Sequence, residues 1–281
     1  MKRFLFSLLL SLLICSPLIA QQMMKPSLGD LVGGNYRQHP RYRGVVGHWI
    51  MNESGGLTAY DISGNGNHGT LTNGPVWTQG QFGPALSFDG VDDYVDAGTI
   101  PAFDSASQIS MAGWIYRSAT NVHVAFGPRA DGTYKSTILW WTDGNIYFSI
   151  ANGLGEYSYS ALSGTGWHHV ALVFNGQLSG NARLIAFIDG IQVTLTYGAT
   201  PPATTASNAN QGPMIIGREQ EVRYSTGLID DVRLYNRVLT ADEVMSLYSD
   251  GFLEFRRSRN WLALLNQQPA AAARIHRVTQ Q

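Results

Sequence analysis

Short apolar runs separated by Gly, Asn, Asp and Pro make up the chain from Val45 onward. Runs of about four to eight residues that are rich in β-branched and aromatic side chains and bounded by turn residues are typical of β-strands. We therefore predict strands at residues 45–51, 85–88, 94–97, 109–116, 122–127, 137–141, 145–151, 156–161, 168–174, 184–188, 191–197, 214–217 and 228–235.

Two neighbouring pairs of these runs are joined by an Asp-Gly dipeptide. Asp143-Gly144 stands between the sixth and seventh runs, and Asp189-Gly190 between the tenth and eleventh. A tight two-residue turn needs positive φ values, which Asp and Gly supply. Both pairs are therefore predicted β-hairpins.

The last apolar pattern before the C-terminal tail has a helical period. Val244, Leu247 and Tyr248 recur three and four residues apart, and Thr240 precedes Glu243 by three residues. Thr-x-x-Glu before an apolar stripe is a capping box, in which the two residues satisfy each other's backbone N–H groups. One short helix is therefore predicted after the strands.

Many short strands with turn signals, and no helices alternating with them, favour a sandwich over a parallel α/β sheet. About 200 residues is a normal size for one such domain. The predicted fold class is all-β, a two-sheet antiparallel sandwich with one short C-terminal helix.

Five segments carry a family resemblance. The chain reads DISGNGNHG at 61–69, LSFDGVDDYV at 86–95, GWHHVALVF at 166–174 and FIDGIQV at 187–193, and the strand-to-helix segment 227–248 follows. In this order and spacing they resemble the laminin-G-like domains of the concanavalin A-like lectin/glucanase superfamily. The resemblance implies a jelly-roll sandwich over residues 45–251. Because this fold hosts lectins, hydrolases, receptors and structural proteins, it leaves the function open.

Residues 1–20 have the pattern of a secretory signal peptide. Lys2 and Arg3 precede an apolar run from Phe4 to Ile14, and Leu18-Ile19-Ala20 offers a cleavage site. The run is shorter than the roughly 20 residues that span a bilayer, so we expect a secreted, periplasmic or cell-surface protein without a membrane span after cleavage. An uncleaved anchor is the alternative. Cys15, the only cysteine, would leave with this segment, so no disulfide is expected.

Charge and composition divide the rest of the chain. Residues 21–44 are polar and aperiodic and are predicted to form an arm or linker, whereas 252–281 form a basic C-terminal tail that could bind a partner protein. The formal net charge is −1 and charged residues make up 14% of the chain, which gives no electrostatic reason to expect nucleic acid as a partner.

The sequence lacks the acidic strand of the glucanases in this superfamily. The resemblance implies a Glu-x-Asp-x-x-Glu pattern for an active enzyme, because glycoside hydrolysis uses two carboxylates at a set separation. Asp92-Asp93 and Asp230-Asp231 are adjacent pairs, and neighbours on a strand point to opposite faces. The same alternation separates His168 from His169. We therefore do not expect an enzyme.

The loop at 61–67 could bind calcium. Asp61, Ser63 and Asn65 match the first half of a helix-loop-helix calcium loop, and Ca²⁺ prefers about six to eight oxygen ligands. Thr72 stands where that loop would place its Glu, so a polar turn is the alternative. Laminin-G-like domains often bind calcium at the sandwich rim, and the resemblance implies Asp61 and Asp230 as acidic ligands, supported by Asn65. Ca²⁺ is the one cofactor predicted.

Exposed aromatic rings are the candidate ligand-binding residues, since sugar rings present apolar C–H faces. Trp140 and Trp141 are consecutive, so one of them faces away from the core. Tyr147 alternates with apolar neighbours. Trp141, Tyr147 and Tyr157 lie on successive predicted strands and could converge on one sheet face; the alternative is that loops or a second sheet cover them.

Three functions follow from these features. The first is a secreted non-catalytic binding module, for a glycan, surface polysaccharide or adhesion partner. The second is a structural, surface or virion-decorating protein in which the sandwich is a scaffold and the tail binds a partner. The third is a glycoside hydrolase.

Overall fold

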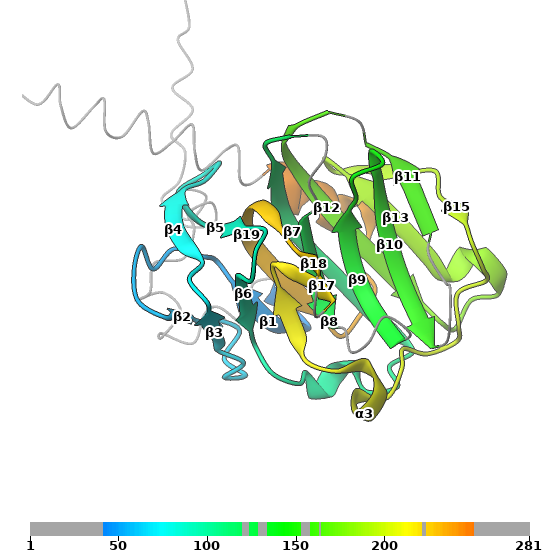
Figure 1. The fold of residues 1–281 in the computed structure, drawn as a ribbon. Coiled ribbons are helices and arrows are strands. Elements are labelled where there is room, and N and C mark those ends of the chain that lie inside the picture. The colour runs from blue at the N-terminus through cyan, green and yellow to red at the C-terminus, as the bar shows by residue number, and fades with distance from the viewer. Residues whose placement is uncertain are drawn as a thin grey trace, which may run out of the picture.

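The computed structural model describes residues 42–119, 124–128, 134–152, 158–162, 164–220 and 223–249. Two antiparallel sheets pack face to face (Figure 1), so the predicted all-β, two-sheet antiparallel sandwich is confirmed. The predicted signal peptide, the arm before residue 42 and the tail 252–281 lie outside the described residues. Among the described residues, no helix is both long and apolar enough to cross a bilayer.

The first sheet, which we call sheet A, contains the longest strands. Its strands are β1 (Val45–Trp49), β4 (Val76–Gln79), β5 (Pro84–Asp89), β7 (Gln108–Arg117), β12 (Gly166–Asn175), β13 (Leu184–Ile188), β14 (Ile191–Val193) and β19 (Thr226–Tyr235). They lie in the order β14-β13-β12-β7-β19-β5-β4, and β1 pairs with β19.

The second sheet, sheet B, carries the candidate site. Its strands are β2 (Thr58–Ala59), β3 (Gly69–Thr72), β6 (Tyr94–Asp96), β8 (Val124–Pro128), β9 (Tyr134–Trp140), β10 (Asn145–Asn152), β11 (Ser158–Ala161), β15 (Thr196–Tyr197) and β16 (Met214–Ile216). Their order is β15-β11-β10-β9-β8-β16-β6-β3-β2. A separate two-stranded ribbon, β17 (Arg218–Gln220) and β18 (Arg223–Tyr224), follows β16 in the chain.

Both predicted hairpins are confirmed. β9 pairs with β10 across a turn in which Gly144 has φ +82°, and β13 pairs with β14 across Asp189 and Gly190, with φ +52° and +79°. The single strand predicted at 191–197 is wrong: the chain leaves sheet A after β14 and joins sheet B as β15. The buried side chain of Leu195 anchors this crossing between the two layers.

The predicted C-terminal helix spans residues 241–249. Its capping box is confirmed, because the Thr240 N–H donates to the Glu243 carboxylate at 2.9 Å and the Glu243 N–H donates to Thr240 Oγ1 at 3.2 Å. The other named helices among the residues that the structure describes are single turns: η3 (Pro101–Phe103), η4 (Gly180–Arg183) and α3 (Asn208–Gln211).

Alternation along the strands separates the core from the two outer faces. Phe126, Ile138 and Trp140 of sheet B point into the main core between the sheets. The outer face of sheet A is covered by the C-terminal helix, whose Val244 and Leu247 join a second apolar cluster. Part of the outer face of sheet B remains accessible, and this is the face that Figure 1 presents.

Candidate functional site

A hollow of about 240 Å³ opens on the outer face of sheet B. Two strands of the sheet and the β17–β18 ribbon supply its walls. The residues that line it are Leu139, Trp141, Tyr147, Glu219 and Arg223.

Strand alternation aims the aromatic side chains at this hollow. Trp140 is fully buried in the core, so Trp141, the next residue, turns to the outer face and is partly exposed. Leu139 and Tyr147 are cross-strand partners in the β9–β10 hairpin and therefore share that face. The backbone N–H of Trp141 donates to the Asn145 carbonyl at 2.9 Å, which fixes the backbone of Trp141 at the base of the hairpin turn.

An ion pair from the ribbon forms the opposite wall. Arg223 Nη1 lies 3.1 Å from Glu219 Oε2, and the Glu219 side chain is fully buried whereas that of Arg223 is 42% exposed. The Arg223 guanidinium also lies over the Trp141 ring, 4.9 Å from its centroid. The hollow is therefore lined by an indole ring and by a guanidinium that a buried carboxylate holds in position.

Tyr147 is anchored through its hydroxyl. The phenol donates to Asp143 Oδ2 at 2.7 Å, and burial, reinforced by this hydrogen bond, raises the pKa of Tyr147 to about 12. Burial opposes ionisation of Asp143, but hydrogen bonds from Tyr147 and Asn145 outweigh it and lower the pKa of Asp143. At neutral pH the Tyr147 hydroxyl is thus protonated. The Tyr147 ring lies against that of Tyr159, with ring centroids 5.4 Å apart.

The structure brings two of the three predicted ligand-binding residues together, Trp141 and Tyr147. Tyr157, the third, lies outside the described residues. Glu219 and Arg223 were missed, because the polar stretch that carries them has no apolar alternation to indicate a strand.

Two of the predicted calcium ligands, Asp61 and Asn65, are engaged in hydrogen bonds within the protein. Asp61 accepts hydrogen bonds on both carboxylate oxygens, from His48 N and Ser63 N on one and from Ser63 Oγ and Asn67 N on the other, at 2.8–3.0 Å. Asn65 uses its side-chain NH₂ to donate to the Val46 carbonyl at 3.2 Å. These bonds build the polar turn that the sequence allowed as an alternative.

Asp230, the third predicted ligand, is fully buried on β19 opposite Trp114 of β7. Calcium at Asp61, Asn65 and Asp230 stays a prediction, and the hydrogen bonds on Asp61 count against it, because a cation would have to displace them.

Three other acids lie close together. Asp89, Asp92 and Asp93 each place a carboxylate oxygen within 4.8 Å of the others. Asp92 and Asp93 belong to a bend between β5 and β6, so the strand alternation that we applied to this pair does not hold. Carboxylate oxygens are ligands that Ca²⁺ prefers, and these three residues are a group of potential ligands among those that the structure describes.

The two adjacent histidines point to opposite faces, as alternation requires. His168 Nδ1 lies 2.7 Å from Asp189 Oδ2, and its ring meets Trp140 at the core edge. His169 lies on the other side of the sheet against Trp114, and burial lowers its pKa to about 4. The surroundings of both histidines therefore indicate structural roles.

Comparison with known proteins adds a family and a fold. A family model described as the concanavalin A-like lectin/glucanases superfamily matches residues 89–245. The chain is similar to Trypanosoma rangeli sialidase in complex with 2,3-difluorosialic acid, with a TM-score of 0.53 and 16% identity over 73% of this chain and 32% of that chain. It is also similar to the binding domain of Paraclostridial Mosquitocidal Protein 1, with a TM-score of 0.52 and 16% identity over 74% of this chain and 52% of that one.

The chain therefore spans about a third of the length of the sialidase. At these identities the likenesses concern the fold. The search of curated proteins found no match.

Proposed function

Since this chain belongs to the concanavalin A-like lectin/glucanase superfamily, we propose that it binds carbohydrate, without cleaving it, in the hollow between Trp141 and the β17–β18 ribbon. The observation that carries the proposal is one small hollow lined by the Trp141 indole, by the Arg223 guanidinium that lies over part of it, and by Glu219. The expected secretion would place this binding outside the cytoplasm.

The lining offers both kinds of contact that a sugar needs. The rings of Trp141 and Tyr147 can stack against the apolar C–H face of a pyranose or furanose. The Arg223 guanidinium, 42% exposed, can donate hydrogen bonds to neighbouring hydroxyl groups, and the buried Glu219 carboxylate holds it in place. The ion pair and the Tyr147–Asp143 bond fix these groups before the ligand arrives, which lowers the entropic cost of binding.

The same lining favours binding over hydrolysis. Glycosidases place two carboxylic groups on either side of the scissile bond, one of them protonated to act as general acid. Of the described residues that line the hollow, Glu219 is the single acid, and it is paired with Arg223. One carboxylate paired with a guanidinium does not supply the two separated carboxyl groups that hydrolysis needs.

A Trp141→Ala variant tests this function. We expect it to lower the affinity for the bound glycan by about tenfold or more, because losing a stacked aromatic face costs roughly 1.5–3 kcal/mol. A glycan array would identify ligands of the wild-type protein, and isothermal titration calorimetry would measure both proteins against them.

Trp167→Ala is the matched control, since Trp167 is a half-buried tryptophan on the other sheet and should not change the affinity. Release of reducing sugar by the wild-type protein would contradict the non-catalytic part of the proposal. Equal glycan affinity for Trp141→Ala and wild type would remove the hollow as the site.

A further inference from the structure

A second pair of aromatic rings lies on the side of the ribbon away from the hollow. Tyr94 of β6 and Tyr224 of β18 have ring centroids 6.4 Å apart, and both side chains are partly exposed. The Arg218 guanidinium lies over the Tyr94 ring, 4.0 Å from its centroid. This pair repeats the combination of ring and guanidinium found in the hollow.

The ribbon connects the second pair to the hollow. Arg218 and Tyr224 are cross-strand partners in it, and Arg223 precedes Tyr224 in the chain. Arg218 reaches Tyr94 on one side, whereas Arg223 reaches Trp141 on the other. The ribbon therefore presents one guanidinium to each aromatic group.

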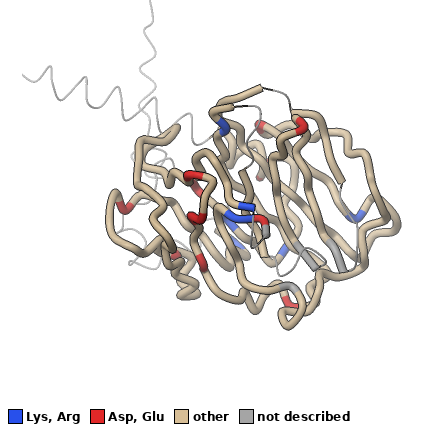
Figure 2. Tube along the Cα trace, viewed as in Figure 1, with Lys and Arg blue, Asp and Glu red and all other residues tan. Residues whose placement is uncertain are grey.

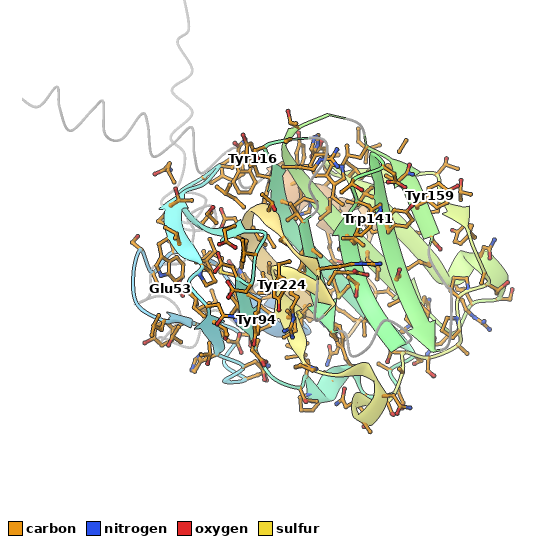
Figure 3. The ribbon with its side chains drawn as sticks, in the orientation of Figure 1. Glu53, Tyr94, Tyr116, Trp141, Tyr159 and Tyr224 are labelled. Atoms are coloured by element: carbon orange, nitrogen blue, oxygen red, sulfur yellow. The ribbon has the colours of Figure 1, made fainter. Side chains whose placement is uncertain are left out.

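The aromatic contacts continue at the far end of the hollow. Tyr147 stands against its cross-strand partner Tyr159 of β11. We call the resulting series the aromatic row; its members are Tyr94, Tyr224, Trp141, Tyr147 and Tyr159. Figure 3 shows the labelled members Tyr94, Tyr224, Trp141 and Tyr159 spread across the viewed face.

The aromatic row is much longer than one sugar ring. It begins on β6 and ends on β11, which are five strand steps apart in the order β11-β10-β9-β8-β16-β6. At about 4.8 Å per step this distance is roughly 24 Å.

Charges of both signs occur along the row. Among the described residues, Arg218 and Arg223 are accompanied by Glu219 and Asp143, two basic and two acidic residues. Figure 2 shows basic and acidic positions interspersed, with both signs close together at the ribbon. Such a surface has no net field that would attract a polyanion.

We propose that the aromatic row binds an extended neutral polysaccharide along its length, so that several successive sugars are recognised rather than a single chain end. This rests on the proposed function of the hollow. Stacked rings at intervals suit a polymer whose apolar sugar faces recur, because each ring adds a contact without demanding one fixed register.

The test uses the full chain with disaccharides, hexasaccharides and polymers of arabinan, xylan, mixed-linkage β-glucan and galactomannan, and polygalacturonate as an acidic probe. Calorimetry and affinity electrophoresis would measure wild type, Trp141→Ala and Tyr94→Ala. Tyr116→Ala, a partly exposed tyrosine on sheet A, is the matched control.

We expect wild type to bind a hexasaccharide about tenfold or more tightly than the disaccharide of the same series. Tyr94→Ala should remove most of that gain and leave disaccharide binding unchanged, whereas Trp141→Ala should weaken both. Melting temperatures close to that of wild type would show that each variant is folded.

The contrary outcomes separate the two proposals. Equal affinity for disaccharide and hexasaccharide would overturn the extended site. The same holds if Tyr94→Ala binds polymer like wild type while Trp141→Ala does not. In both cases the hollow would remain as the proposed binding site. Tighter binding of polygalacturonate than of every neutral probe would overturn the neutral class. Wild-type protein that binds none of the probes would overturn both proposals.

Discussion

Asp93 is a buried acid with two other carboxylates beside it. It is 3% exposed and accepts the Asp89 N–H at 3.1 Å, and the oxygens of Asp89 and Asp92 lie within 4.8 Å. Burial first, and then the charges of Asp89 and Asp92, raise the pKa of Asp93. An acid whose pKa is higher in the folded state destabilises that state once it ionises, so the cost is present above the folded pKa and absent below the unfolded value.

Asp93→Asn is therefore expected to raise the melting temperature in EDTA at pH 7. Relief of like-charge repulsion of roughly 0.5–1 kcal/mol corresponds to about 1–3 °C for a domain of this size. The gain should vanish as the pH falls below the unfolded pKa, and differential scanning fluorimetry at several pH values measures it. Asp104→Asn, at an exposed acid, is the control.

A lower melting temperature for Asp93→Asn in EDTA would contradict this account. Measuring the same melting temperatures after adding CaCl₂ tests whether calcium binds at the Asp89, Asp92 and Asp93 group instead of at the residues first predicted. An ion held by Asp89, Asp92 and Asp93 would stabilise wild type and not the variant.

Single residues were predictable from the sequence where strand alternation applies. It placed Trp141 opposite Trp140, and it set Tyr147 apart from Phe148. It failed for Asp92 and Asp93, because a bend has no fixed two-residue period and can bring neighbouring carboxylates together.

The C-terminal helix and the β17–β18 ribbon differ in what stabilises them. The helix was predictable because its cap and apolar stripe are local, although the bidentate Arg237–Glu243 pair at 2.7–2.8 Å was not expected. The ribbon was missed because its strands are short and polar. It packs over the buried Ala125 and Leu139. Its conformation depends on packing between distant segments, which outweighs local propensity.

Removing the helix cap by Thr240→Ala should destabilise the domain. Loss of the hydrogen bond from the Glu243 N–H to Thr240 Oγ1 costs about 1 kcal/mol, or roughly 2–4 °C in melting temperature. Thr240→Ser keeps the hydroxyl and should melt close to wild type. If both variants melt at the wild-type temperature, the capping box does not contribute to global stability.

At the scale of the whole sandwich, His169 is a buried titratable group whose protonation opposes folding. His169 lies beneath the helix beside the stacked rings of Trp114 and Tyr248, with ring centroids at 5.3 and 6.3 Å from them. Burial lowers its pKa to about 4; the charge of Asp231 opposes this shift and that of Arg233 adds to it. Between the unfolded value of about 6.5 and 4 the unfolded chain binds more protons, so stability falls as the pH falls through this window.

His169→Phe should remove part of that dependence. One proton contributes a slope of up to about 1.4 kcal/mol per pH unit to the free energy of unfolding, and phenylalanine can pack in the same aromatic surroundings. Urea unfolding of both proteins from pH 7 to 4.5 measures the two slopes. Identical slopes would show that His169 is not the group responsible.

The ribbon also has a consequence for redesign. It forms a two-stranded sheet of its own, and the residues that flank it bind one backbone position, because Gly217 N donates to the Ala125 carbonyl and Ser225 Oγ accepts from Ala125 N. Between these junctions lie Glu219, Tyr224 and both arginines of the binding face. Segment 218–224 is therefore a candidate for replacement as a unit. Grafting other sequences between Gly217 and Ser225 should yield binders of new selectivity on the same sandwich.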